Sequence, residues 1–294
     1  SYGTPFHTDG LHEWIKTTTP ITLTVTDQGA CAVDDVTTYY MNTLVDASYC
    51  EEPETCVPLH DYEDPGWIKY TGPFFKEEES CHMIEYWSID ALGNRETIKA
   101  QCVSVDDTPP ETTKSFGEPN CSPERCDSEY WTVNSSTPFT LTATDNKAGV
   151  NETYYRYCSG IDNCSDDWNI YSSTFHVTGL EDGEFRLEYY SKDNLGNDEE
   201  IKYEIDYLDN TPPVTTITFP PNNTWQSTDF SVHITDDDHC LDTCYYRVHN
   251  GTDWTGWMER ECNSDVTIDV DGCDPCLKQN ITVEAYAKDC LGQI

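Results

Sequence analysis

The sequence predicts an all-β protein made of three tandem β-sandwiches, and three observations lead to this prediction. First, residues 83–96 (MIEYWSIDALGNRE), 186–199 (RLEYYSKDNLGNDE) and 282–293 (TVEAYAKDCLGQ) repeat one pattern. Second, the linkers DDTPP and DNTPP place Pro109 and Pro212 at a spacing of 212 − 109 = 103 residues. Third, short segments of alternating apolar and polar residues recur between turns, and no 3.6-residue apolar period is sustained. A repeat of this length with many short strands favours tandem sandwiches over one large domain.

Each copy carries its elements in the same order. An alternating strand is predicted at residues 21–27, 139–145 and 230–236, and a Tyr-Tyr strand follows at residues 37–41, 152–157 and 244–248. Alternation places one face of each strand in a core. The next strand ends in Asp-x-Leu-Gly. The predicted domains are therefore residues 1–107, 108–210 and 211–294, and the opening GTPF of residues 3–6 is interpreted as a first linker, about one period before Pro109.

The third copy lacks its final strand within this chain. Copies one and two continue after the Gly-Asn turn into residues 95–105 and 198–208, whereas the third stops at Ile294. An incomplete sandwich exposes unpaired backbone groups and part of its core, which is costly. We expect either that the chain is a piece of a longer repeat array, or that an extended segment of an identical subunit fills the gap by donor-strand exchange. Residues 1–11 are one such segment.

The charge of the chain excludes several partner classes. Asp and Glu number 55 against 16 Lys and Arg, which gives a formal net charge of −39 over 294 residues. Such a surface repels nucleic acid and anionic lipid headgroups, so neither is an expected partner. A run of 18 or more apolar residues does not occur, so direct membrane insertion of this segment is not expected.

Fifteen cysteines point to an oxidising compartment outside the cell. A zinc site would need paired clusters, and the sequence has a single CxxC, from Cys273 to Cys276. Disulfides are therefore favoured over metal, and the odd count leaves one thiol without a partner inside the chain. The sequence leaves the pairing open. The disulfide candidates, which lie a few residues apart, are Cys50, Cys56, Cys121, Cys126, Cys158, Cys164, Cys240 and Cys244.

Seven Asn-x-Ser/Thr sequons follow residue 119, and each has an allowed middle residue. Together with the cysteines they predict N-linked glycans, although Asn and Ser/Thr also gather in turns for conformational reasons. The predicted acceptors are Asn120, Asn134, Asn151, Asn163, Asn222, Asn250 and Asn280.

Acidic side chains end two strands of every copy, and the linkers carry more of them. In a sandwich these loops lie at the end that receives the preceding linker, so carboxylates from different loops are expected to converge there. The expected sets are Asp107, Asp145 and Asp193 at one junction, and Asp209, Asp236 and Asp289 at the other. Ca²⁺ takes six to eight oxygens from several loops, which makes it a candidate cofactor besides glycans. The alternative is that these side chains only hydrogen-bond their own turns. The predicted ligands are Asp106, Asp107, Asp145, Asp193, Asp209, Asn210, Asp236 and Asp289.

Residues 70–96 (YTGPFFKEEESCHMIEYWSIDALGNRE) resemble the immunoglobulin-like repeats of large bacterial and archaeal extracellular proteins. The DNTPP linker and the YYR strands are similar to the same group, and the cysteine content resembles that of archaeal surface proteins. Gln293 departs from the pattern, because the turn has Asn in the other copies. The resemblance implies immunoglobulin-like sandwiches and a secreted scaffold, and it implies no particular activity.

A non-catalytic structural role follows from these observations. The eight histidines are scattered, and neither HExxH nor GxSxG occurs. We expect a disulfide-stabilised, N-glycosylated subunit of a cell-surface assembly, such as a filament, a pilus-like appendage or a surface layer (S-layer), in which identical subunits form a homopolymer. The alternative is an adhesin, or a carbohydrate-binding or spacer region of a larger secreted protein.

Overall fold

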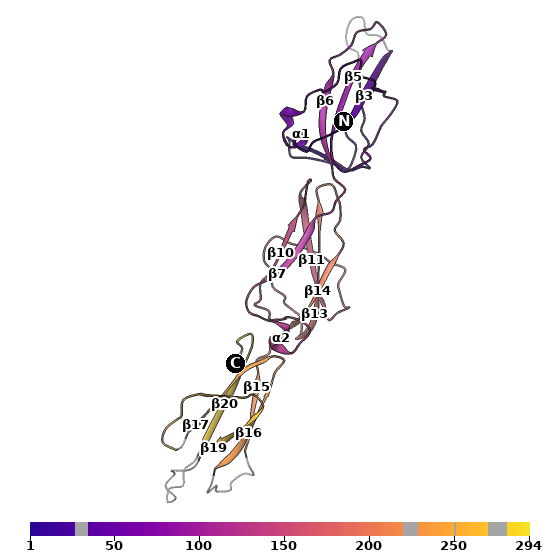
Figure 1. Ribbon diagram of the computed structural model, residues 1–294. Helices are drawn as coiled ribbons and strands as arrows, with labels where there is room; N and C mark the ends of the chain where they lie inside the picture. Colours follow the sequence, from indigo (N-terminus) through magenta and orange to yellow (C-terminus); the bar gives the residue numbers. More distant parts are fainter. Residues whose placement is uncertain (27–34, 220–228, 250, 270–280) are drawn as a thin grey trace, which may run out of the picture. The chain divides into compact units, whose positions relative to one another are not determined.

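The computed structural model describes residues 1–26, 35–219, 229–249, 251–269 and 281–294, and these form β-structure almost throughout (Figure 1). The helical elements in this part of the chain are short: α1 (Ser48–Glu51), η1 (Pro53–Thr55) and α2 (Pro123–Cys126). None of the helices within these ranges is long and apolar enough to cross a bilayer. The all-β class predicted from the sequence is confirmed.

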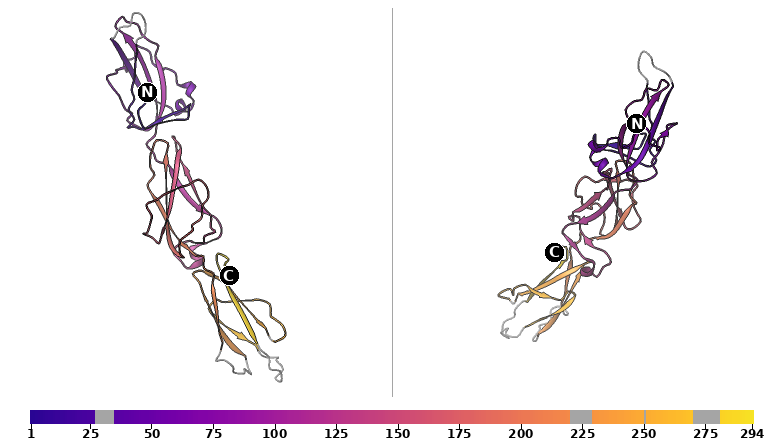
Figure 2. Two further views of the ribbon diagram at one scale, coloured as in Figure 1. Left: turned by 180° about the vertical axis from the view of Figure 1, so that it is seen from behind. Right: turned by 45° about the horizontal axis from the view of Figure 1, so that its top comes forward.

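The described residues group into two compact units. Unit 1 contains residues 1–113, 142–154 and 190–201, and unit 2 contains residues 114–141, 155–189 and 202–294. The border between the units runs through the predicted middle repeat. The repeat boundaries at residues 107 and 210 therefore stay predictions, although the strands and cores follow the three copies, as the colours of the strands show in Figure 2.

The first copy forms one six-stranded sheet in the order β1-β2-β6-β5-β3-β4. The strands are β1 (Phe6–Thr8), β2 (Glu13–Ile15), β3 (Val36–Val45), β4 (Ile68–Lys69), β5 (Cys81–Asp90) and β6 (Lys99–Val105). Bridges from Tyr2 to Ile21 and from Ile21 to Phe74 form a second layer. Ile15, Ile21, Ile84, Val103 and Val105 fill the core between the layers.

The second copy is a two-sheet sandwich. A two-stranded sheet, β10-β7, accompanies a six-stranded sheet in the order β12-β11-β13-β14-β9-β8. The strands are β7 (Glu111–Phe116), β8 (Asn120–Cys121), β9 (Thr132–Val133), β10 (Phe139–Thr144), β11 (Val150–Ser159), β12 (Asn169–Ile170), β13 (Gly183–Asp193) and β14 (Lys202–Leu208). Phe139, Phe185 and Leu187 are among the fully buried side chains of its core.

The third copy has two three-stranded sheets, β15-β16-β19 and β18-β17-β20. The strands are β15 (Val214–Thr218), β16 (Phe230–Asp237), β17 (Leu241–His249), β18 (Met258–Arg260), β19 (Ser264–Ile268) and β20 (Thr282–Asp289). Burial alternates along β16, and Val232 and Ile234 meet Val283 from the other sheet in the core. The strand β5 pairs with β6 and β13 pairs with β14, whereas in the described residues β20 pairs with β17 alone.

Residues 21–26 differ from the sequence prediction. The matching segments of copies two and three form β10 and β16, but here only Ile21 makes a β-bridge. The Thr22 amide donates a hydrogen bond to the Ser1 carbonyl at 2.9 Å. A strand needs a longer partner, and residues 22–26 show none within the described chain. Residues 27–34 lie outside the described residues.

The interpretation of residues 3–6 as a Thr-Pro-Pro linker is also corrected. The Gly3 amide donates to the Pro20 carbonyl at 2.8 Å, and the Gly117 amide donates to the Pro138 carbonyl at 2.9 Å. Gly3-Thr4-Pro5 is thus the counterpart of Gly117-Glu118-Pro119, beyond the linker and β7. The N-terminal residues, which the sequence suggested as a donor segment, pack on their own sheet, because Tyr2 contacts the first core.

Candidate metal sites and inter-repeat disulfides

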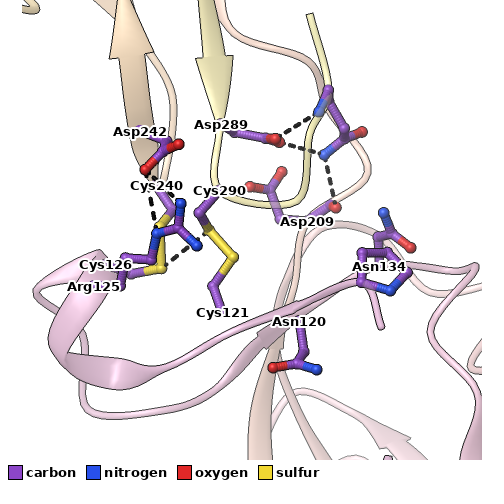
Figure 3. Close-up of a disulfide and its surroundings, with 12 residues drawn as sticks. Asn120, Cys121, Arg125, Cys126, Asn134, Asp209, Cys240, Asp242, Asp289 and Cys290 are labelled. Carbon is purple, nitrogen blue, oxygen red and sulfur yellow. Dashed lines mark hydrogen bonds and ion pairs between the residues drawn. A yellow bond between two sulfur atoms is a disulfide. The ribbon is translucent and has the colours of Figure 1, made fainter. Parts of the chain in front are cut away.

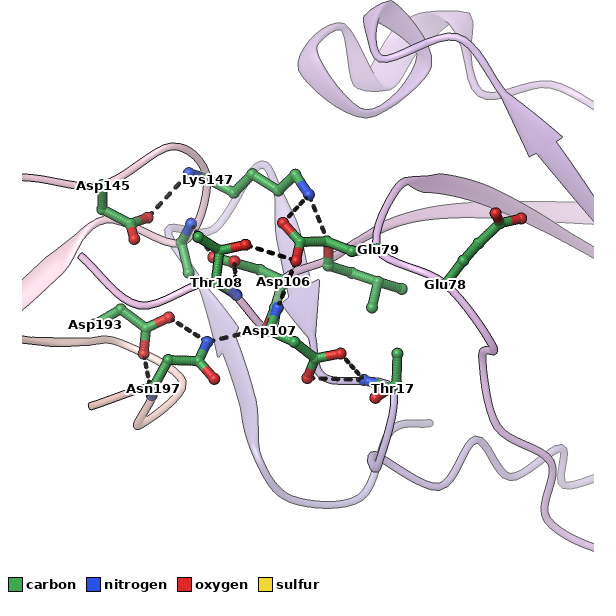
Figure 4. A network of polar contacts seen from close by, with 12 residues as sticks. Thr17, Glu78, Glu79, Asp106, Asp107, Thr108, Asp145, Lys147, Asp193 and Asn197 are labelled. Atoms are coloured by element: carbon green, nitrogen blue, oxygen red, sulfur yellow. Dashed lines mark hydrogen bonds and ion pairs between the residues drawn. The ribbon is translucent and has the colours of Figure 1, made fainter. Parts of the chain in front are cut away.

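Three carboxylates from three separate segments meet in unit 1. Asp106 follows β6, Asp145 follows β10, and Asp193 ends β13. One oxygen from each lies within 4.8 Å of the others. We call Asp106, Asp145 and Asp193 the first acidic site (Figure 4). The sequence predicted a convergence of Asp107, Asp145 and Asp193 at this junction, and the structure has Asp106 where Asp107 was expected. Whether a metal binds here stays a prediction.

Backbone amides hold the three carboxylates of the first acidic site. The Oδ1 of Asp145 accepts bonds from the amides of Lys147 (2.9 Å) and Gly149 (2.8 Å). The Ala148 amide donates to Oδ2 of Asp106 at 2.9 Å. Burial raises the pKa of Asp106, and the charges of Asp145 and Asp193 add to this effect. The Oδ2 atom of Asp145 is buried without a hydrogen-bond partner among the described residues.

A second set of carboxylates converges in unit 2 in the same manner. Asp209 follows β14, Asp238 lies between β16 and β17, and Asp289 ends β20. One oxygen from each again lies within 4.8 Å of the others. We call Asp209, Asp238 and Asp289 the second acidic site; Figure 3 shows Asp209 and Asp289 facing one another.

The second acidic site is strongly desolvated around Asp209. Asp209 is 3% exposed, and its Oδ1 accepts a bond from the Thr211 amide at 3.2 Å. Its Oδ2 has no hydrogen-bond partner among the described residues. Burial, together with the charges of Asp238 and Asp289, raises the pKa of Asp209 to about 7. Burial also raises the pKa of Asp238, and the charge of Asp289 contributes.

The Asp-x-Leu-Gly turn joins each acidic site to the preceding linker through one side-chain amide. In the first site the Asn197 amide donates to the Asp106 carbonyl at 3.1 Å and to Oδ2 of Asp193 at 2.7 Å. In the second site the Gln293 amide donates to the Asp209 carbonyl at 3.2 Å and to Oδ2 of Asp289 at 2.6 Å. Gln293, which departs from the sequence pattern, therefore makes the same two bonds as Asn.

Three predicted ligands lie outside these sites. Asp107 accepts a bond from the Thr17 amide at 3.3 Å. Asn210 donates to Asp182 and accepts a bond from the Ser135 amide at 2.8 Å.

Asp236 is bound by Arg260 at 2.7 Å, and both side chains are buried. Sequence reasoning aligned Asp236 with Asp145 and so missed Asp238. The available signal was the turn itself: Asp238 accepts the amide of the residue two positions on, Cys240, as Asp145 accepts that of Lys147.

All eight cysteine candidates form disulfides, but only Cys158 and Cys164 bond to a close neighbour in sequence. The pairs are Cys50–Cys81, Cys56–Cys102, Cys121–Cys290, Cys126–Cys240, Cys158–Cys164 and Cys244–Cys262. The three other cysteines, Cys31, Cys273 and Cys276, lie outside the described residues.

Two disulfides join the second copy to the third within unit 2. Cys121–Cys290 and Cys126–Cys240 span 169 and 114 residues, and we call them the inter-repeat disulfides. Their four sulfur atoms lie within 4.8 Å of one another (Figure 3). Beside them, Arg125 and Asp242 form an ion pair at 2.6 Å.

The described sequons differ in exposure. Asn151 and Asn163 are exposed, whereas Asn120 and Asn134 are partly buried. The Asn120 side-chain amide donates to the Gly117 carbonyl at 3.1 Å, and Asn134 accepts a bond from the Ser136 amide at 2.8 Å. Glycosylation stays a prediction at all four. Asn222, Asn250 and Asn280 lie outside the described residues.

No protein-family model matches the sequence, and no curated protein matches it either. Among solved structures, the chain is similar to the FN1–FN3 domains of chicken CNTN1, at 9% identity, with 88% of this chain and 86% of that chain covered and a TM-score of 0.29. It is also similar to dimeric latent PorU from Porphyromonas gingivalis, at 12% identity, with 87% of this chain and 26% of that chain covered and a TM-score of 0.25. Both likenesses are too distant to assign a family or a function.

Proposed function

We propose that the chain is a non-catalytic structural region of an extracellular cell-surface protein, and that it works in an assembly of identical subunits. The observation that carries this proposal is the pair of inter-repeat disulfides, Cys121–Cys290 and Cys126–Cys240. A single disulfide leaves a joint free to rotate, whereas two joining the same segments restrict it. Disulfides of this number persist in oxidising compartments, which supports the extracellular location.

The mechanism is mechanical. Tandem sandwiches carry load along their strands, and disulfides limit how far a chain extends once a sandwich opens. The linkers contain Pro109-Pro110 and Pro212-Pro213, which restrict backbone rotation between copies. The carboxylate-rich surface keeps the exterior hydrated. These properties suit a filament, a pilus-like appendage or a surface layer, with donor-strand exchange as one route between subunits.

Negative-stain microscopy of the native protein tests the proposal. We expect ordered polymers, and we expect them to persist in oxidising buffer and to shorten when thiol reductant is added. Single dispersed particles at every concentration, with an intact mass equal to one complete chain, would argue against a homopolymer.

A second candidate function is adhesion, because the third copy exposes an aromatic pair. Trp254 and Trp257 are 39% and 43% exposed, and the Arg247 guanidinium lies 4.3 Å and 4.6 Å from their ring centroids. Flat exposed rings of this kind stack on sugars. A glycan array distinguishes the two functions: adhesion predicts binding that the substitution Trp254→Ala with Trp257→Ala abolishes, while the structural role predicts none.

A further inference from the structure

We propose that the second acidic site, formed by Asp209, Asp238 and Asp289, binds a calcium ion that fixes the linker between the second and third copies. The inference goes beyond the structural role and does not depend on it. Three facts carry it: a buried oxygen without a partner, a set of donors that suits this ion, and ligand loops that other bonds hold in place.

The first fact is that the Oδ2 atom of Asp209 is buried without a hydrogen-bond partner among the described residues. A carboxylate that is 3% exposed normally satisfies both oxygens, because an unpaired buried charge is costly. Here Oδ2 lacks a hydrogen-bond donor in the described residues, and the oxygens within 4.8 Å belong to two further carboxylates. These three carboxylates form no ion pair with a lysine or arginine in that part of the chain. A bound cation would remove both the unpaired oxygen and the repulsion.

The second fact is the chemistry of the donors. All three are carboxylates, and hard oxygen donors of this kind suit Ca²⁺ and Mg²⁺ over zinc or copper. Oxygens that lie within 4.8 Å of one another can all reach one Ca²⁺ ion, whose ligands stand at about 2.3–2.6 Å in flexible geometry. Mg²⁺ demands a tight octahedron at about 2.0–2.1 Å and retains water more strongly. The site therefore favours Ca²⁺, with water completing the coordination.

The third fact is that the ligand loops are already ordered. The Cys240 amide donates to Oδ1 of Asp238 at 2.8 Å, and the Cys290 amide donates to the Cys240 carbonyl at 3.0 Å. The inter-repeat disulfides anchor these two cysteines to the second copy, and Cys290 directly follows Asp289. The loops thus lose little conformational freedom when an ion binds.

The expected consequence is a fixed linker. Asp209 belongs to the linker, whereas Asp238 and Asp289 belong to two loops of the third copy. An ion bound by all three joins the linker to both loops, next to the inter-repeat disulfides. Covalent and ionic connections would then restrain the same joint.

The test uses the full chain with its disulfides intact, freed of metal by EDTA and dialysis. Calcium is titrated by isothermal calorimetry, and the melting temperature is measured with and without CaCl₂ at equal ionic strength. We expect Ca²⁺ to raise the melting temperature more than Mg²⁺ does. The substitution Asp209→Asn should weaken calcium binding by at least about tenfold. Asp238→Asn provides a second variant with the same expected direction.

The sign of the Asp209→Asn effect separates a metal ligand from a structural residue. In EDTA the variant should melt at the same temperature as the wild type or higher, because it removes a buried charge; in calcium it should melt lower. The control is Asp237→Asn, which removes a neighbouring exposed charge and should leave the calcium response unchanged. The proposal is overturned if calcium fails to raise the wild-type melting temperature, or if Asp237→Asn and Asp209→Asn reduce binding equally. Neither outcome bears on polymer formation.

Discussion

At the scale of single residues, the side-chain amide after the Asp-x-Leu-Gly turn has a different environment in the first and second copies. Asn197 is 5% exposed and bonds both to its own turn and to the Asp106 carbonyl. Asn94 bonds Oδ2 of Asp90 at 2.7 Å but is exposed. The sequence shows the same Leu-Gly-Asn turn in both places, so it could not show which Asn also holds a linker.

Asn197→Ala should therefore destabilise the protein more than Asn94→Ala. The first substitution removes the donor to a buried carbonyl and to the buried carboxylate of Asp193, and an unsatisfied buried group costs about 1–3 kcal/mol. The exposed bond of Asn94 is replaced by water, so about 0.5 kcal/mol or less is expected there. Guanidinium unfolding of both variants measures the difference. Equal losses would show that the bond to the linker contributes nothing.

A buried glutamate in the first copy predicts a pH dependence. Glu85 is fully buried on β5 and accepts the amides of Leu59 (2.7 Å) and His60 (3.0 Å) through Oε1. Its Oε2 bonds Nδ1 of His60, and this bond raises the pKa of His60 in the folded protein. The folded state then holds a proton more tightly than the unfolded chain, whose histidine titrates near about 6.5.

The stabilisation by His60 should be complete below about pH 6.5 and should disappear as the pH rises through the higher folded pKa. The substitution His60→Gln should lower the melting temperature at acidic pH and have a smaller effect in alkaline buffer. His176→Gln, an exposed histidine of another copy, serves as the control and should show no such dependence. If His60→Gln lowers the melting temperature equally at both pH values, the ion pair between protonated His60 and Glu85 does not stabilise the fold.

At the scale of elements, periodicity predicted most strands because alternation and burial have the same cause. The Tyr-Tyr segments lie in β3, β11 and β17, and the strands that lead into the Asp-x-Leu-Gly turn are β5, β13 and β20. Two features could not be predicted from the sequence, because each depends on a partner that is distant in sequence. Residues 21–26 alternate correctly but have no full-length partner in the described chain. Among the six disulfides of the described residues, five join cysteines at least 18 positions apart, so spacing alone could not give the pairing.

The acidic sites, like the strands, could be predicted from the sequence in most of their residues. Strand ends placed Asp145, Asp193 and Asp289 at two points of convergence, and the second linker placed Asp209 there. In the first linker the expected residue was Asp107, and the structure has its neighbour Asp106. Asp236 was expected in the second site in place of Asp238, because β16 continues one residue beyond the aligned Thr235-Asp236, as far as Asp237, whereas β10 ends at Thr144. Asp236 therefore still lies within the strand, on the same buried face as Val232 and Ile234, where it forms an ion pair with Arg260.

Removal of one inter-repeat disulfide should cost more than removal of a local one. Loop entropy assigns about 4–5 kcal/mol to a loop of 114 residues and about 2 kcal/mol to one of 6 residues. We compare two double variants. One carries Cys126→Ser and Cys240→Ser, and the other carries Cys158→Ser and Cys164→Ser. Unfolding of each in guanidinium is followed by tryptophan fluorescence. Cys121–Cys290 stays in place in the first variant and reduces its loss somewhat. If the variant without Cys158–Cys164 loses more free energy of unfolding, chain entropy does not determine how much these disulfides stabilise the protein.

At the scale of the whole molecule, the net charge of −39 dominates the electrostatics. Only 16 basic side chains oppose 55 acidic ones, and several of them are already bound in buried or half-buried ion pairs such as Lys114–Asp206 and Arg260–Asp236. The remaining acidic groups repel one another and weaken the compact state. The hydration that suits an extracellular surface is therefore obtained at the expense of stability in dilute buffer.

Added salt should raise the stability of the metal-free protein. The screening length shortens from about 30 Å at 0.01 M to about 3 Å at 1 M, so repulsion between exposed carboxylates almost disappears. In EDTA we expect the melting temperature to rise steadily with NaCl, and KCl should act equally because screening depends on ionic strength alone. Calcium at matched ionic strength should then add a separate increase, through the second acidic site. A melting temperature independent of NaCl would show that the excess charge is spread too thinly to oppose folding, and that buried groups set the stability instead.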